Sequence, residues 1–175
     1  RDFRSTWVKN NLSYPHAATL YWEVPQKGKD KPMDVFWYEG GIKPATPKSL
    51  IKKGKKMPQD GVMFVGEKGT ILADYGYGNA VLLDVRNEEQ FLASVKVPEF
   101  ELIDQTSEMI RAFKGEQPSR GDFVNVQTVA EAICLGNLTI RMDDRLEWDN
   151  KNMRVTNLEA ANEFVSRKYR KGWEL

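Results

Sequence analysis

Aromatic residues in two short segments are the side chains best suited to bind a ligand. Tyr21 and Trp22 lie in one segment of alternating apolar and polar residues, and Phe36, Trp37 and Tyr38 lie in the next. Neighbouring residues of a strand point to opposite faces, so we expect rings on both faces of one sheet. One face must pack on helices, and the other then needs a cover: a partner subunit, another domain or a sugar-like ligand. The candidates for a substrate cleft or a subunit interface are Tyr21, Trp37, Tyr38, Glu39 and Lys43.

His16, the only histidine, is a sixth candidate. It comes just before the first aromatic segment, so it could act as an acid–base group at the rim of the sheet, although an exposed loop position is more common. Cys134 lies in the middle of a predicted helix with no second histidine to orient it, so we predict a buried apolar thiol. Asp122 belongs to an Arg-Gly-Asp tripeptide, but we expect it to cap the helix that begins at Phe123.

Metal and nucleotide sites are not predicted for this chain. Four carboxylates lie between positions 143 and 149, but their spacing matches no calcium loop, and Arg141 and Arg145 would neutralise them, which favours an ion-paired surface turn. The glycines of Gly76-Tyr-Gly78 precede a strand-like segment, whereas a dinucleotide site needs a helix there. A β-turn is therefore the better interpretation of this segment.

Composition and charge exclude several classes of protein. The 175 residues suit one domain, and a formal net charge of +1 excludes a generally basic nucleic-acid binder. The single cysteine excludes a disulfide framework or a Cys-rich zinc site, and no stretch approaches the roughly 20 apolar residues that cross a bilayer. Residues 43–58 carry six lysines and no acid, but no aromatic residue lies among them, which favours a solvated loop.

The pattern of apolar residues predicts strands in the first half of the chain and helices in the second. Strands are predicted at residues 17–24, 33–38, 62–65, 70–74, 80–85 and 146–148. We expect the first two to form a long-looped hairpin, and the next three to form a meander with a tight turn at Gly66–Gly69. Helices are predicted at residues 87–92, where Asn87-Glu-Glu-Gln90 offers a capping pattern, and at residues 106–114 and 123–142. A last helix is predicted from a capping box at Thr156–Glu159 to Trp173. The helix over 123–142 is apolar around most of its circumference, so we expect it to be buried on more than one side. This order predicts an α+β fold: an open, mainly antiparallel β-sheet with helices packed on one face.

Several longer motifs follow one another along the chain. Trp37-Tyr-Glu-Gly-Gly-Ile-Lys-Pro44 comes first, and Gly61-Val-Met-Phe-Val-Gly-Glu-Lys-Gly69 comes second. The second half adds the segment from Phe123 onward, Leu135-Gly-Asn137, Leu146-Glu-Trp-Asp149, Thr156-Asn157 and Tyr169-Arg-Lys-Gly-Trp173. Over nearly the whole chain, these motifs resemble the C-terminal domain of the Gfo/Idh/MocA oxidoreductase family, in the branch with the bacterial-type C-terminal region.

The resemblance implies a domain whose open sheet contributes to a substrate cleft and to oligomer contacts. In that family, an N-terminal Rossmann domain binds NAD or NADP and supplies a catalytic lysine in a Glu-Lys-Pro motif. Ile42-Lys43-Pro44 imitates the Lys-Pro pair but follows two glycines in the wrong domain, so no catalytic role is transferred to it. We therefore expect residues 1–175 to be a single C-terminal domain from a longer two-domain enzyme. On this view the chain has no cofactor or metal of its own, and its catalytic residues are unknown.

The function implied is substrate binding and oligomerisation in an NAD(P)-dependent oxidoreductase that acts on a sugar or polyol. Two alternatives stay open: an NAD-dependent glycoside hydrolase on the same scaffold, and a non-catalytic carbohydrate or protein interaction module. The expected partners are the Rossmann domain of the same protein, a second copy bound through the open sheet face, and a sugar-like substrate. Neither nucleic acid nor a membrane is expected as a partner. Location stays open between the cytoplasm and export, because any signal would precede Arg1.

Overall fold

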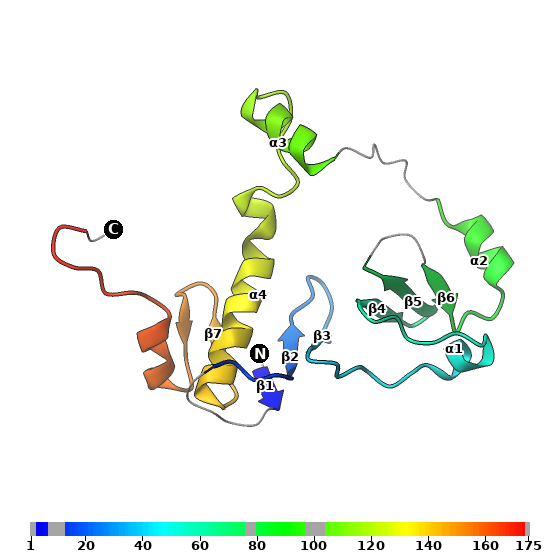
Figure 1. The fold of residues 1–175 in the computed structure, drawn as a ribbon, viewed down its shortest axis with the longest axis horizontal. Coiled ribbons are helices and arrows are strands. Elements are labelled where there is room, and N and C mark those ends of the chain that lie inside the picture. The colour runs from blue at the N-terminus through cyan, green and yellow to red at the C-terminus, as the bar shows by residue number, and fades with distance from the viewer. Residues whose placement is uncertain (1–2, 7–12, 76–79, 97–103, 174–175) are drawn as a thin grey trace. The chain divides into compact units, whose positions relative to one another are not determined.

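The chain forms two compact units in the computed structural model, which describes residues 3–6, 13–75, 80–96 and 104–173 (Figure 1). The first unit comprises Arg1–Lys43 and Glu108–Leu175, and the second comprises Pro44–Ser107. The described residues combine antiparallel sheets with helices, which confirms the predicted α+β class. Their strands form three small sheets where a single open sheet was expected.

The first unit is built on a three-stranded antiparallel sheet in the order β1-β2-β3. Its strands are β1 (Phe3–Thr6), β2 (Thr19–Val24) and β3 (Met33–Tyr38). The pairing of β2 with β3 confirms the predicted long-looped hairpin, and it places Tyr21 opposite Phe36 and Leu20 opposite Trp37. Because residues that face each other across two strands share a face, this register decides which rings can meet.

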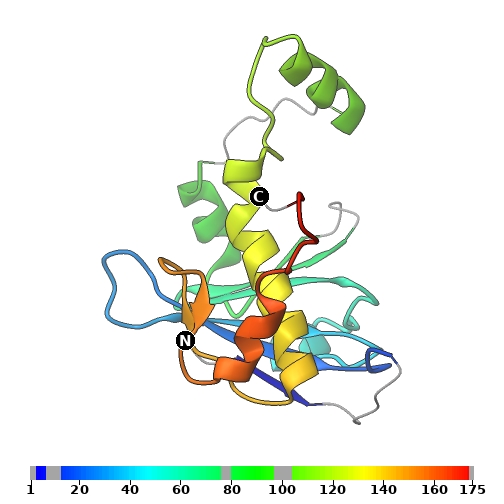
Figure 2. The same ribbon diagram turned by 90° about the vertical axis from the view of Figure 1, so that its left-hand side faces the viewer.

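One face of this sheet packs on α4 (Phe123–Met142), which Figure 2 shows in yellow against the blue strands. Leu20 and Trp22 are buried there, as their alternation predicts, and the Trp22 indole N–H donates a hydrogen bond to the carbonyl of Ala132 at 3.1 Å. Gly136 allows this close approach. A Cβ at that position would lie 2.8 Å from side-chain atoms of both Leu20 and Trp22.

Only the C-terminal half of α4 is buried, so the expected burial on more than one side does not extend over the whole helix. Leu135, Leu138 and Ile140 belong to the core, whereas Phe123 at the other end is 93% exposed. The helix begins as predicted, since the Asp122 carboxylate accepts a hydrogen bond from the backbone N–H of Asn125 at 2.7 Å. An apolar sequence around a helix predicts burial only if other elements are long enough to surround it.

Among the described residues, one helix, α4, is long and apolar enough to cross a membrane, by length and composition only. The core helix of a protein in water passes the same test. No run of roughly 20 apolar residues was expected from the sequence. That expectation holds for uninterrupted apolar runs, whereas α4 reaches the length with polar residues among its apolar ones.

The C-terminal part of the first unit departs from two predictions. The hairpin of β7 (Trp148–Asp149) and β8 (Arg154–Val155) is followed by the 3₁₀ helix η1 (Glu159–Phe164). The expected capping box does not form, because the Thr156 hydroxyl donates to the carbonyl of Glu147 at 3.2 Å. The expected final helix to Trp173 is also absent, since helical structure ends at Phe164 within the described residues.

The second unit contains the predicted meander. It consists of β4 (Gly61–Gly66), β5 (Gly69–Asp74) and β6 (Val81–Leu83), with α1 (Lys48–Lys52) before them and α2 (Glu88–Ser94) after them. Leu50, Leu72 and Leu83 form its core. The lysine-rich segment is mostly exposed as predicted, but burial of Leu50 gives it a short helix that the prediction of a loop missed. Gly76-Tyr-Gly78, with the β-turn predicted there, lies outside the described residues.

Candidate functional site

The sheet of the first unit divides the candidate residues between its two faces. Alternation along β2 and β3 places Tyr21 and Tyr38 on the face opposite to Trp22, which we call the outer face. Trp37 lies in register with Leu20, on the face that α4 covers. The aromatic pairs of the sequence are therefore separated by the sheet, as the alternation predicts.

Three rings form a row on the outer face. The centroids of Tyr21 and Phe36 are 4.9 Å apart, and those of Phe36 and Tyr38 are 6.1 Å apart. Both distances suit offset aromatic contacts. Phe36 is nevertheless 51% exposed, so this row leaves apolar ring surface uncovered.

Two carboxylates meet at the Tyr21 hydroxyl. Its oxygen lies 2.7 Å from Asp34 Oδ1 and 3.1 Å from Glu23 Oε1. The hydrogen bond to Asp34, followed by desolvation and by Glu23, raises the pKa of Tyr21 well above its usual value. One phenol proton serves two negative groups, so this end of the outer face keeps acidic character. Sequence reasoning missed Asp34 and Glu23, although their register across the hairpin could have indicated them.

A different group of candidates meets where β3 ends. Trp37 is 57% exposed, and its indole N–H donates to Glu39 Oε2 at 3.3 Å. The backbone N–H of Glu39 donates to the carbonyl of Ala18 at 3.0 Å, which holds this end against β2. Gly40 follows with φ of 68°, and a Cβ there would lie 2.0 Å from the carbonyl oxygen of His16. The structure thus brings Trp37, Glu39 and the backbone of His16 together.

The remaining candidate side chains are exposed. The His16 side chain is exposed, as its loop position suggested, and Lys43 is exposed beyond the turn at Gly40 and Gly41. Cys134 is exposed, so the prediction of a buried thiol was wrong. The physical reason is that α4 is covered mainly on the side of Leu135 and Leu138, leaving position 134 in solvent.

Acidic residues near β7 form a surface turn and not a metal site. Asp149 accepts hydrogen bonds from the backbone N–H groups of Lys151 and Asn152 and from the Asn152 side chain, and these bonds lower its pKa. Arg145 pairs with Glu147 at 3.4 Å. Within the described part of the chain, no group of three or more His, Cys, Asp or Glu side chains could hold a metal ion.

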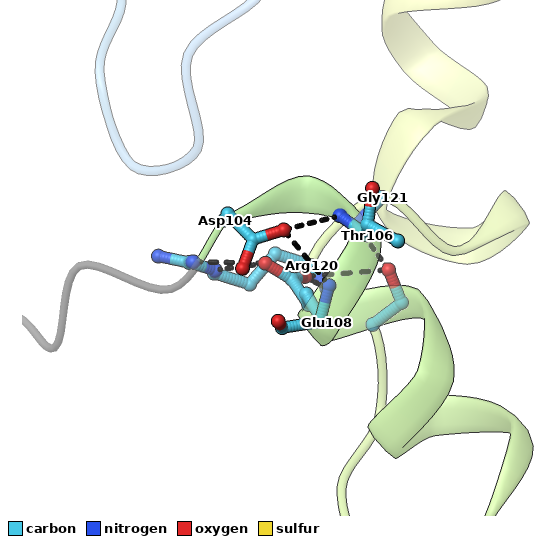
Figure 3. Close-up of polar contacts among 7 residues, drawn as sticks. Asp104, Thr106, Glu108, Arg120 and Gly121 are labelled. Carbon is cyan, nitrogen blue, oxygen red and sulfur yellow. Dashed lines mark hydrogen bonds and ion pairs between the residues drawn. The ribbon is translucent and has the colours of Figure 1, made fainter.

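Glu108 forms a polar cluster of its own with the segment that precedes α4 (Figure 3). Its carboxylate accepts hydrogen bonds from the Arg120 backbone N–H at 2.6 Å, from Arg120 Nη2 at 2.8 Å and from the Ser119 hydroxyl at 3.3 Å. The Arg120 contacts hold the pKa of Glu108 below its usual value. Nearby, Asp104 accepts from the Thr106 N–H at 3.1 Å, close to the start of α3 (Gln105–Phe113). The Glu108 cluster fastens α3 to the chain that leads into α4, which is a structural role.

The chain has no match in comparisons with protein-family models, with curated proteins or with solved structures. The geometry of the candidate residues and the motifs of the sequence are therefore the grounds for a functional proposal.

Proposed function

We propose that this chain is the substrate-binding and oligomerisation domain of an NAD(P)-dependent oxidoreductase that acts on a sugar or polyol. The motifs that resemble the Gfo/Idh/MocA family support the class of enzyme. The observation that carries the proposal is the pair of Trp37 and Glu39 at the end of β3, with an exposed indole ring beside a carboxylate.

This pair has the chemistry that binds a sugar. The flat, apolar surface of the Trp37 ring can stack on the C–H face of a pyranose or an extended polyol. The Glu39 carboxylate accepts hydrogen bonds only, so it can bind neighbouring hydroxyl groups while it orients the indole N–H. Its backbone is fixed by Ala18, and a binding group held on a strand end loses little freedom when the ligand arrives.

We assign oligomerisation, the second part of the proposed function, to the outer face. Tyr21, Phe36 and Tyr38 expose ring surface on the side of the sheet away from α4, where a partner subunit can cover it. This assigns the ligand to the Trp37 end and the subunit contact to the Tyr21 row.

The nicotinamide cofactor does not fit the residues described in this chain. A dinucleotide site needs a parallel βαβ unit with a helix N-terminus at the pyrophosphate. Every strand pairing among the described residues is antiparallel. In this proposal, NAD or NADP is bound by an N-terminal Rossmann domain of the same protein, and this chain binds and orients the substrate.

The test measures the binding of simple sugars and polyols to the chain by titration calorimetry or NMR. Trp37→Ala and Glu39→Gln are each expected to weaken binding by about tenfold, as loss of one stacking or charged contact would. Phe113→Ala is the matched control, because Phe113 is also an exposed aromatic residue, at 84%, and lies in neither proposed contact. Equal loss in the control, or no loss at Trp37, would contradict the proposal, as would tight binding of NADH to this chain alone.

A further inference from the structure

We propose that the outer face of β2 and β3 is covered by the basic C-terminal segment, Arg167–Trp173, of a second copy of this chain. This inference rests on the oligomerisation role proposed above and names the contact that would form it. We call residues 167–173 the C-terminal arm.

The C-terminal arm is basic, aromatic and exposed. Four of its seven residues are Arg or Lys, and none is acidic. All seven are exposed, and the arm runs away from the helices and sheet of the first unit (Figure 1, red). Arg167 lies 6.0 Å from the ring centroid of Tyr169, and Arg170 lies 4.4 Å from that of Trp173. The arm therefore presents guanidinium groups and rings together, without a described core to pack on.

The outer face has the complementary chemistry. On β2 and β3 it carries two carboxylates, Glu23 and Asp34, and no lysine or arginine, while the neighbouring β1 places Arg4 in register with Tyr21. None of the ion pairs found among the described residues involves either carboxylate. Arginine suits such a surface because its planar group can bind a carboxylate in bidentate fashion and can also stack on aromatic rings.

The dimensions of the arm and the face agree. A flat, open sheet face touches a small ligand on one side only, whereas an extended segment can follow a strand and make many contacts. Seven extended residues span about 23 Å, close to the roughly 20 Å of a six-residue strand. The arm can thus run the length of β3, with Arg side chains over the Phe36 and Tyr38 rings and toward Asp34.

A second copy is the favoured source of the arm. The arm leaves from η1, whose Ala161 is buried in the same core as Leu20 and Trp22, on the α4 side of the sheet. To reach the outer face of its own sheet, the arm would have to pass around a sheet edge. In a two-fold dimer, each copy instead places its arm on the exposed face of the other, and both faces are covered by one repeated contact.

Charge reversal with rescue tests this contact, with the molar mass of the full chain measured by light scattering or sedimentation. We expect the chain to dimerise. We expect the dimer Kd to rise at least about tenfold in the face variant, Asp34→Lys, and also in the arm variant, which combines Arg167→Glu with Arg170→Glu. Combining the face and arm changes in one chain should restore dimerisation, because each altered face then meets an altered arm. Lys55→Glu with Lys56→Glu is the control, since it makes the same charge change at exposed lysines of the second unit.

Three outcomes would overturn the inference: a chain that stays monomeric at high micromolar concentration, a dimer insensitive to both changes, or no rescue in the combined variant. Circular dichroism of each variant separates loss of the contact from loss of folding. Sugar binding at Trp37 is measured on the same variants. A dimer that ignores the arm but loses sugar binding with Trp37→Ala would overturn the arm contact and leave the proposed function standing.

Discussion

Replacement of Gly136 by alanine tests how closely α4 approaches the sheet. In an exposed helix this change stabilises a protein by about 0.5–1 kcal/mol, because alanine loses less conformational freedom on folding. At position 136 the added Cβ would lie 2.8 Å from Leu20 Cδ1 and 2.8 Å from Trp22 Cζ2. The flexible Leu20 methyl group can turn aside. The rigid Trp22 ring cannot move without stretching its hydrogen bond to Ala132.

The expected result is therefore net destabilisation. Forcing a methyl group into a packed core costs about 1–3 kcal/mol, which outweighs the gain in helix propensity. We expect Gly136→Ala to lower the free energy of unfolding by about 1 kcal/mol and Tm by about 2–4 °C. Asn137→Ala is the matched control. Its side chain is exposed on the next position of the same helix, and the change should raise stability by a few tenths of a kcal/mol.

Urea unfolding followed by circular dichroism measures both variants, and a double-mutant cycle identifies the cause. In a Trp22→Phe background, the smaller ring leaves room for the Cβ, so Gly136→Ala should become neutral or stabilising. Stabilisation by Gly136→Ala in the wild-type background would refute the close approach. An identical cost in both backgrounds would show that the strain arises somewhere other than at the Trp22 ring.

Three further predictions concern turns, caps and charge. Gly40→Ala should destabilise the chain by about 3 kcal/mol or more, through positive φ and backbone collision together, whereas Gly41→Ala, with open space around it, should cost only about 1 kcal/mol in urea unfolding. Asp122→Ala should cost about 1 kcal/mol of local helix stability, seen as faster hydrogen exchange at the start of α4; unchanged exchange would contradict the cap. Arg120 lowers the pKa of Glu108 in the folded state, so the ionised Glu108 carboxylate stabilises the fold at pH values above the ordinary glutamate pKa. This stabilisation is lost as the pH falls through the lowered pKa of the folded state. Glu108→Gln should remove this acid-dependent part of the stability curve, and an unaltered curve would contradict the pairing.

Much of the local structure could be predicted from the sequence because its causes are local. Period-two alternation gave β2 and β3, the Gly66–Gly69 turn marked the β4–β5 hairpin, and Asn87 and Asp122 marked the starts of α2 and α4. Each of these signals depends on a few neighbouring residues and on the backbone geometry that they favour. Sequence reasoning was less successful wherever the outcome depended on a distant partner.

The segment after Phe164 illustrates that limit. Its residues include good helix formers, but Tyr169 and Trp173 have no surface within the described part of the chain on which a helix could pack, and a short isolated helix is marginal in water. The same reason explains Cys134 and the exposed start of α4. An apolar pattern states which side chains could be buried, and the neighbouring elements decide which of them are.

By itself, the sequence determined the α+β class, the strand alternation that separates Trp37 from Tyr38, and the aromatic character of both faces. Only the tertiary structure decided which face α4 covers, that Asp34 and Glu23 meet at the Tyr21 hydroxyl, and that Trp37 remains exposed beside Glu39. The physical reason is the range of the interactions. Alternation follows from the backbone of a single strand, whereas register, packing and exposure depend on residues far apart in the chain.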